Sequence, residues 1–133
     1  MTETDAPGST PRLTVALTFD HDAISDAVRR GDGPMLISRG EFGPRVGVPR
    51  ILDLLERNSI PATFFVPGHT LATFPDSVAA IVAAGHELGC HGWAHEDLAT
   101  LSVTDERDVM TRSCEAIGRA AGQPPRGFGS GSI

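Results

Sequence analysis

Three short apolar runs alternate with amphipathic segments along the chain, and each run stops at polar residues or glycine. The runs cover residues 13–19, 60–68 and 87–91, and their β-branched and aromatic content predicts three strands. The first run contains no charged residue, which is typical of a strand that is covered on both faces of a parallel sheet. We therefore expect a buried first strand.

Apolar residues at helical spacing predict three helices. The first covers residues 48–58, with a proline in its first turn, where proline is favoured. Pro75 opens the second helix and Gly85 ends it. Thr104 is the expected N-cap of the third, which Gly122 ends.

The connection over residues 25–47 carries five glycines and two prolines and is predicted to be a long loop. Loops of this length inside compact domains are usually functional. The resulting order is strand, loop, helix, strand, helix, strand, helix. This alternation predicts an α/β fold with a parallel sheet and about three βα units.

Acids and histidines gather where the predicted strands end. Asp20 and Asp22 follow the first strand, His69 the second, and His91 and His95 the third. The carboxyl ends of parallel strands meet along one rim, and functional groups collect there. We expect these five side chains to share that rim.

The spacing of two of these histidines indicates a metal site. Side chains four residues apart, such as His91 and His95, face the same way if the segment coils into a helical turn, and two imidazoles suit a divalent metal such as zinc. One carboxylate completes a facial set. Of Asp20 and Asp22, one would then be the ligand and the other a general base.

The remaining candidates have plainer alternatives. His69 fits a turn imidazole bonded to backbone as well as a substrate contact, and Trp93 fits packing over the metal loop as well as stacking on a substrate. His86 is expected to be structural. His21 lies between the two acids, and strand alternation points its side chain away from them.

Composition narrows the function classes. The 133 residues suffice for one domain, the net charge is −6, and the chain contains no lysine, so a nucleic-acid partner is not expected. Cys90 and Cys114 lack CxxC spacing and are expected to be buried thiols, with a disulfide as the alternative. Neither a signal peptide nor an apolar stretch of about 18 residues stands out. We expect a cytoplasmic protein without a membrane partner.

The segments "TFDHD" and "HGWAH", about seventy positions apart, resemble two motifs of a known family. This is the polysaccharide deacetylase family (NodB homology, carbohydrate esterase family 4), whose motifs read TFDDG and HSxxH. "GHELGCHGWAHEDL" and the text before it look most like the branch with peptidoglycan-deacetylase-like enzymes and cyclic imide or allantoinase-like amidohydrolases. The resemblance covers residues 13 to about 128.

The resemblance implies a fold and a role for each site residue. The fold would be the N-terminal part of a distorted (β/α) barrel, with residues 1–12 a disordered tail and 13–133 a partial domain truncated at its C-terminus. Asp20 would be the general base, and Asp22, His91 and His95 would bind Zn²⁺. The reaction would be amide hydrolysis, in which a water held on the metal attacks the carbonyl of an N-acetylated sugar or a cyclic amide.

The chain departs from the family pattern in two ways. Its acids are spaced D-x-D and are followed by Ala23 in place of glycine, which suits the imidase-like branch. The family's later motifs, an Arg-Pro brace and an acid histidine, fall beyond the matched residues. We therefore expect either completion by a second chain in a homo-oligomer or an inactive remnant that binds metal. A metal-free α/β binding module is the third alternative.

Overall fold

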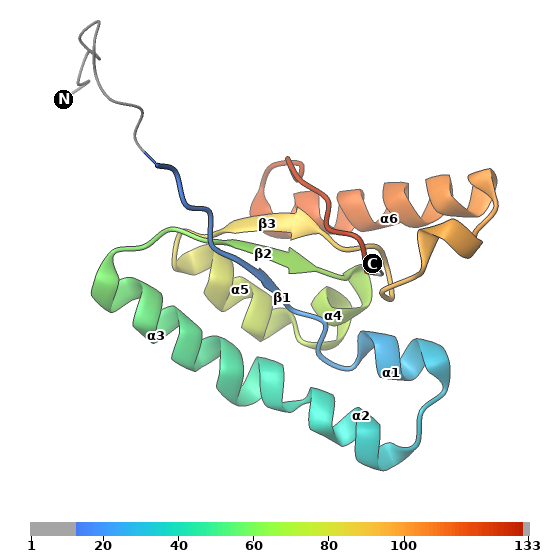
Figure 1. Cartoon of the computed structure of the whole chain (residues 1–133), viewed down its shortest axis with the longest axis horizontal. Coiled ribbons are helices and arrows are strands. Elements are labelled where there is room, and N and C mark those ends of the chain that lie inside the picture. Colours follow the sequence, from blue (N-terminus) through green and yellow to red (C-terminus); the bar gives the residue numbers. More distant parts are fainter. Residues whose placement is uncertain (1–12, 132–133) are drawn as a thin grey trace, which may run out of the picture.

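Three parallel strands lie at the centre of the computed structural model, which describes residues 13–131 (Figure 1). They are β1 (Thr18–Asp20), β2 (Thr63–Val66) and β3 (Glu87–Cys90), and the sheet order is β1-β2-β3. Each strand lies inside or at the end of an apolar run, so the three predicted strands are confirmed, although they are shorter than the runs.

Helical segments fill most of the sequence between and after the strands. They are α1 (Ser25–Arg30), α2 (Pro34–Gly40), a π-helical turn (Gly43–Gly47), α3 (Val48–Asn58), α4 (Gly68–Thr73), α5 (Pro75–Ala83), a 3-10 turn (Leu98–Thr100) and α6 (Val103–Ala121).

The predicted helices are confirmed, with one corrected boundary. The helix α3 begins and ends where the apolar spacing predicts. In α6 the N-cap is Ser102 in place of Thr104, because the Ser102 hydroxyl oxygen accepts a hydrogen bond from the amide of Asp105 at 3.1 Å. This is the bond that defines an N-cap. Gly122, with φ of 73°, ends the helix as expected.

The predicted long loop over residues 25–47 is wrong, since this segment forms α1, α2 and the π-helical turn. Its glycines stand at helix ends: Gly31 is the left-handed C-cap of α1, with φ of 72°, and Gly40 is the last residue of α2. Pro34 occupies the first turn of α2, where its missing N–H costs nothing. The prediction failed because glycine and proline are common both at helix ends and in loops. The short helix α4 between β2 and α5 was also not predicted.

The core lies on one face of the sheet. The buried residues Phe64, Val66 and Leu88 of β2 and β3 pack against three helices, which line the sheet in Figure 1. The helix residues of this core are Val48 and Leu55 of α3, Val78 and Ile81 of α5, and Ile117 of α6. A parallel sheet that packs one face against the helices that follow its strands is the arrangement of a βα barrel wall.

The first strand is not covered on both faces, contrary to the prediction. Leu13 and Val15, at the start of the apolar run, are 90% and 73% exposed. Within β1, Thr18 and Asp20 are exposed and Phe19 is partly buried, and in the described sheet β1 pairs along one edge, with β2. The apolar run therefore predicts the strand correctly but not its cover, because the core helices pack against one face of the sheet. At the other end of the sheet, Phe128 forms an isolated parallel bridge with Cys90 and extends the sheet beyond β3.

The two cysteines do not form a disulfide with each other. Cys90 is buried, Cys114 is partly buried, and both thiols are free. Burial raises the pKa of the Cys90 thiol to about 11.

Within residues 13–131, no helix combines the length and the apolar character that crossing a membrane requires.

Substituting Ile117 tests the one-sided core. Ile117→Ala removes a side chain with 0% exposure from the contact between α6 and the sheet, so the free energy of unfolding should fall by about 2–5 kcal/mol. Leu54→Ala, at a site on α3 that is 60% exposed, should change it by less than about 0.5 kcal/mol. Urea denaturation followed by circular dichroism measures both. Equal losses would contradict this assignment of the core.

Candidate metal centre

Strand alternation decides which side chains leave the helix-covered face. Phe19 packs on Phe64 in the core, with ring centroids 5.1 Å apart, so Asp20 points to the opposite face. His21 turns back to the helix side, where it is 4% exposed and its Nε2 lies 3.1 Å from Ser77 Oγ. Burial lowers the pKa of His21. Its side chain thus points away from the acids, as predicted.

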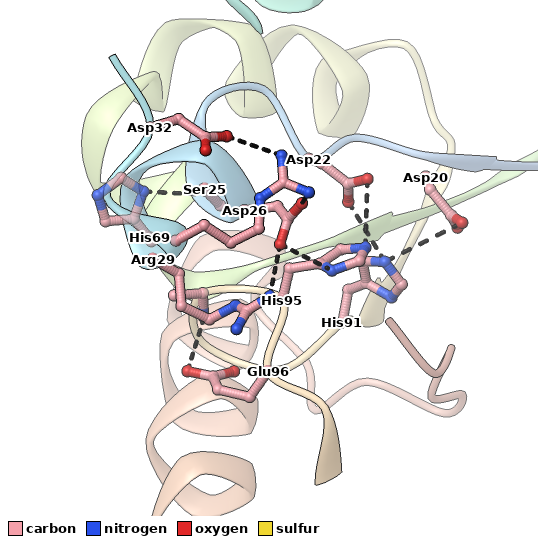
Figure 2. Close-up of polar contacts among 12 residues, drawn as sticks. Asp20, Asp22, Ser25, Asp26, Arg29, Asp32, His69, His91, His95 and Glu96 are labelled. Carbon is pink, nitrogen blue, oxygen red and sulfur yellow. Dashed lines mark hydrogen bonds and ion pairs between the residues drawn. The ribbon is translucent and has the colours of Figure 1, made fainter. Parts of the chain in front are cut away.

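Asp22, His91 and His95 converge at the carboxyl ends of β1 and β3, and we call these three residues the candidate metal centre (Figure 2). Asp22 Oδ1 lies 3.2 Å from His91 Nε2, and Asp22 Oδ2 lies 3.5 Å from His95 Nε2. One potential ligand atom from each residue falls within 4.8 Å of the others. The structure therefore brings together the three side chains predicted to bind metal.

Two atoms of this centre lack the partner that buried polar atoms normally have. Among residues 13–131, Asp22 Oδ1 and His91 Nε2 are the buried side-chain polar atoms without a hydrogen bond. Such atoms are rare in native proteins, and an ion is one of the standard explanations. One carboxylate and two imidazoles also form a donor set that zinc accepts. The residues present therefore fit a divalent metal.

The groups around His91 favour its protonated form. Burial opposes the charged form of His91, but the facing Asp22 carboxylate, the Gly129 carbonyl and the charge of Asp20 outweigh it, so the pKa of His91 is raised.

Asp20 Oδ2 lies 4.0 Å from His91 Nε2, and its side chain is 57% exposed, against 34% for Asp22. Of the two acids, Asp20 is thus the one more open to solvent.

The hydrogen bond at the far nitrogen sets the orientation of His91. Its Nδ1 lies 2.8 Å from the carbonyl oxygen of Gly129. A carbonyl only accepts, so Nδ1 carries the proton, and Nε2, on the side of Asp22, is the nitrogen left to bind a metal. This is the tautomer that a metal ligand needs.

The segment "HGWAH" is a tight turn rather than the helical turn expected from the i, i+4 spacing. Gly92 and His95 both have left-handed φ, 72° and 62°, and a right-handed helical turn excludes these values. The Glu96 carboxylate accepts hydrogen bonds from the amides of Trp93 and Ala94, each at 2.9 Å. Glu96 therefore holds the turn that presents both imidazoles, a role that the sequence did not reveal.

A chain of hydroxyl groups fixes the backbone of Asp22. Thr70 Oγ1 donates to the Asp22 carbonyl at 2.7 Å, and Ser25 Oγ lies 2.6 Å from Thr70 Oγ1. Since the Thr70 proton is already used, Ser25 donates to Thr70 and accepts from Nδ1 of His69, which is 3.1 Å away. Ser25 and Thr70 are fully buried, so this series of hydrogen bonds holds the loop after β1 in place.

His69 and Trp93, the predicted substrate contacts, both have protein partners. In Figure 2 the His69 ring points to Ser25, away from His91 and His95. The Trp93 ring lies under the guanidinium of Arg112, with Cζ 3.3 Å from the ring centroid. A Cβ on Gly68 would come within 2.3 Å of the ring. Packing thus fixes Trp93, and the substrate roles stay predictions.

A sizeable hollow lies elsewhere. It measures about 770 Å³ and is lined by α3, α5 and the residues before β2 and β3, including Leu52, Ile60, Ala80 and His86. These residues stand at the amino ends of the strands, opposite to the candidate metal centre. Because βα folds use the carboxyl ends for chemistry, we assign the site by its side chains and not by the size of this hollow.

Comparison with known proteins places this geometry in a family. The family model for polysaccharide deacetylase matches residues 8–130. A peptidoglycan deacetylase from Helicobacter pylori is 40% identical over 119 residues, which are 87% of this chain and 41% of that protein.

Two solved structures share the fold. One, from Mycobacterium smegmatis and assigned to the polysaccharide deacetylases, aligns with a TM-score of 0.81 at 40% identity, covering 93% of this chain and 46% of that one. The other, Puue allantoinase, aligns with a TM-score of 0.78 at 25% identity, covering 85% of this chain and 44% of that one. The chain thus spans less than half the length of these relatives. The one-sided sheet is the NodB-type, barrel-like architecture, and the chain belongs to the polysaccharide deacetylase family.

Proposed function

We propose that this chain carries the metal-binding part of a zinc-dependent hydrolase that cleaves the N-acetyl amide of a peptidoglycan-type sugar. The observation that carries the proposal is the pair of buried, unbonded atoms Asp22 Oδ1 and His91 Nε2, 3.2 Å apart beside His95. Membership of the family supports the reaction class, and the likeness to the Helicobacter pylori peptidoglycan deacetylase supports the substrate class.

Asp22, His91 and His95 would hold the ion. When bound, zinc supplies a Lewis acid that polarises the amide carbonyl and makes water more acidic. The Gly129 carbonyl keeps Nδ1 of His91 protonated, and Glu96 keeps the turn between the two histidines closed. These contacts hold the ligands in place before an ion arrives, which lowers the cost of binding it.

Asp20 would be the general base. Both oxygens of Asp22 face imidazole nitrogens, whereas the Asp20 side chain is 57% exposed beside the centre. This exposure supports a role in accepting the proton of a water molecule whose oxygen adds to the carbonyl carbon. The C–N bond then breaks, giving acetate and an amine that takes up a proton.

A cyclic amide is the second candidate substrate. The alignment with Puue allantoinase and the D-x-D spacing of Asp20 and Asp22 support it. The chemistry would be the same addition of water to an amide carbonyl, with the ring opened in place of acetate release. We keep the cytoplasmic location and the homo-oligomer as predictions.

Removing one ligand tests the metal site. Wild-type protein should bind one zinc ion per chain in a calorimetric titration. His91→Ala should weaken binding by more than the roughly 10–100-fold that loss of an outer partner costs. His86→Gln is the matched control, because the His86 imidazole accepts from the Ala62 amide at the opposite end of the strands. A wild-type protein without zinc affinity would refute the site.

Substituting the base separates catalysis from binding. Asp20→Asn should leave the zinc affinity unchanged, because Asp20 is outside the ligand set. It should slow acetate release from N-acetylglucosamine oligomers by about 10²–10⁴-fold, the usual contribution of a general base. If the variant loses zinc instead, Asp20 is a ligand and the assigned roles are wrong.

Parallel assays decide between the substrate classes. The zinc-loaded chain is incubated with N-acetylglucosamine oligomers and, separately, with allantoin and a cyclic imide. We expect acetate release from the oligomers to be faster than ring opening of allantoin or of the cyclic imide. Faster ring opening would favour the cyclic-amide alternative. Zinc binding without turnover on either class would identify an inactive chain that retains the metal site.

A further inference from the structure

The two imidazoles of the candidate metal centre have different kinds of oxygen beside Nδ1. Nδ1 of His91 bonds to a backbone carbonyl, whereas Nδ1 of His95 lies 3.7 Å from Oδ1 of Asp26 on α1. His95 also has left-handed φ and is more exposed than His91, 18% against 1%. The group beside Nδ1 of His95 is therefore a side chain and not a backbone carbonyl.

We propose that Asp26 is the positioning residue of the metal centre, holding the His95 imidazole with Nε2 toward Asp22. The proposal rests on the proposed metal site. It adds a residue from a segment that lies outside both recognised motifs.

The placement of the two carboxylates around one ring supports this role. Asp22 Oδ2 faces Nε2 of His95 at 3.5 Å, and Asp26 Oδ1 faces Nδ1 at 3.7 Å. The two acids are four residues apart in the sequence, so the start of α1 places one carboxylate on each nitrogen of the imidazole. Figure 2 shows His95 between them. Asp26 is on the Nδ1 side, which makes it an orienting group and not a fourth ligand.

Two arginines hold the Asp26 carboxylate in place. Arg29 contacts Oδ1 at 2.7 Å and Arg30 contacts Oδ2 at 3.0 Å, from one turn further along α1. Arg30 also bonds to Asp32 at 2.8 Å. Both carboxylate oxygens are thus tied, and only a quarter of the Asp26 side chain is exposed.

An acceptor at Nδ1 has a defined effect on metal binding. It keeps the proton on Nδ1 and leaves the Nε2 lone pair free, and it fixes the plane of the ring. Loss of such a partner typically costs about 10–100-fold in metal affinity. A carboxylate that served only the ion pairs of α1 would have no effect of this kind.

The test compares two acids of the same ion-pair network by zinc titration. Asp26→Ala should bind zinc about 10–100-fold more weakly than wild type, and Asp26→Asn, which keeps an oxygen acceptor without the charge, should fall between them. Asp32→Ala is the matched control, since Asp32 shares Arg30 but does not belong to the contacts of His95. It should bind zinc like wild type.

A second readout follows the ring itself. In ¹⁵N spectra of the metal-free protein, the fraction of His95 with the proton on Nδ1 should fall in Asp26→Ala and stay unchanged in Asp32→Ala. Asp26→Asn keeps the question testable if the alanine variant fails to fold.

The outcomes separate this inference from the proposed function. Zinc affinity lost equally in Asp26→Ala and Asp32→Ala would show that the network only stabilises α1, and unchanged affinity in Asp26→Ala would also overturn the positioning role. Wild-type protein that binds no zinc would instead overturn the metal site itself.

Discussion

The contact between the Asp22 carboxylate and two imidazole nitrogens is the constraint on which the rest of the structure depends. Burying a carboxylate and two imidazoles costs free energy, and this cost is offset only when the groups share a binding partner. The fold accepts the cost by burying Asp22 Oδ1 and His91 Nε2 without a hydrogen bond. Parallel pairing of β1, β2 and β3 brings the acid and the histidines to one rim, although about seventy residues separate them.

The one-sided packing of the sheet explains why that rim is available. Helices α3, α5 and α6 share a single core with one face of β2 and β3, so alternation sends Asp20 away from that core, to the opposite face. On this face Phe65 lies across Gly89, where a Cβ would come within 2.4 Å of the phenyl ring. Leu13 and Val15, which precede β1 at the end of the described sheet, are exposed. Longer members of the family align with this chain over less than half their length.

The strands, α3 and the shared edge of the acids and histidines were predictable because each follows a local rule, whereas the choice of Asp22 over Asp20 as the candidate ligand came from the family resemblance. Period-two alternation sends Asp20 and His21 to opposite faces, and strand ends of a parallel sheet share an edge. The helices of residues 25–47 were not predictable by the same reasoning, since their glycines and prolines mark helix ends and loops alike. Asp26 could be recognised as a partner of His95 only after α1 was known to exist.

The D-x-D spacing has a physical explanation in this fold. Two acids two positions apart lie on the same side of an extended segment, and the intervening His21 is anchored on the other side by Ser77. After Asp22 the chain turns sharply, with Ala23 at φ of 50°, a conformation that glycine adopts freely and that costs an L-residue about 1–2 kcal/mol. Gly40 packs against this turn so closely that a Cβ would lie 2.4 Å from the Ala23 carbonyl oxygen. The absence of a side chain at Gly40 thus lets α2 pack directly on the left-handed turn at Ala23, and with this turn Asp22 faces both histidines.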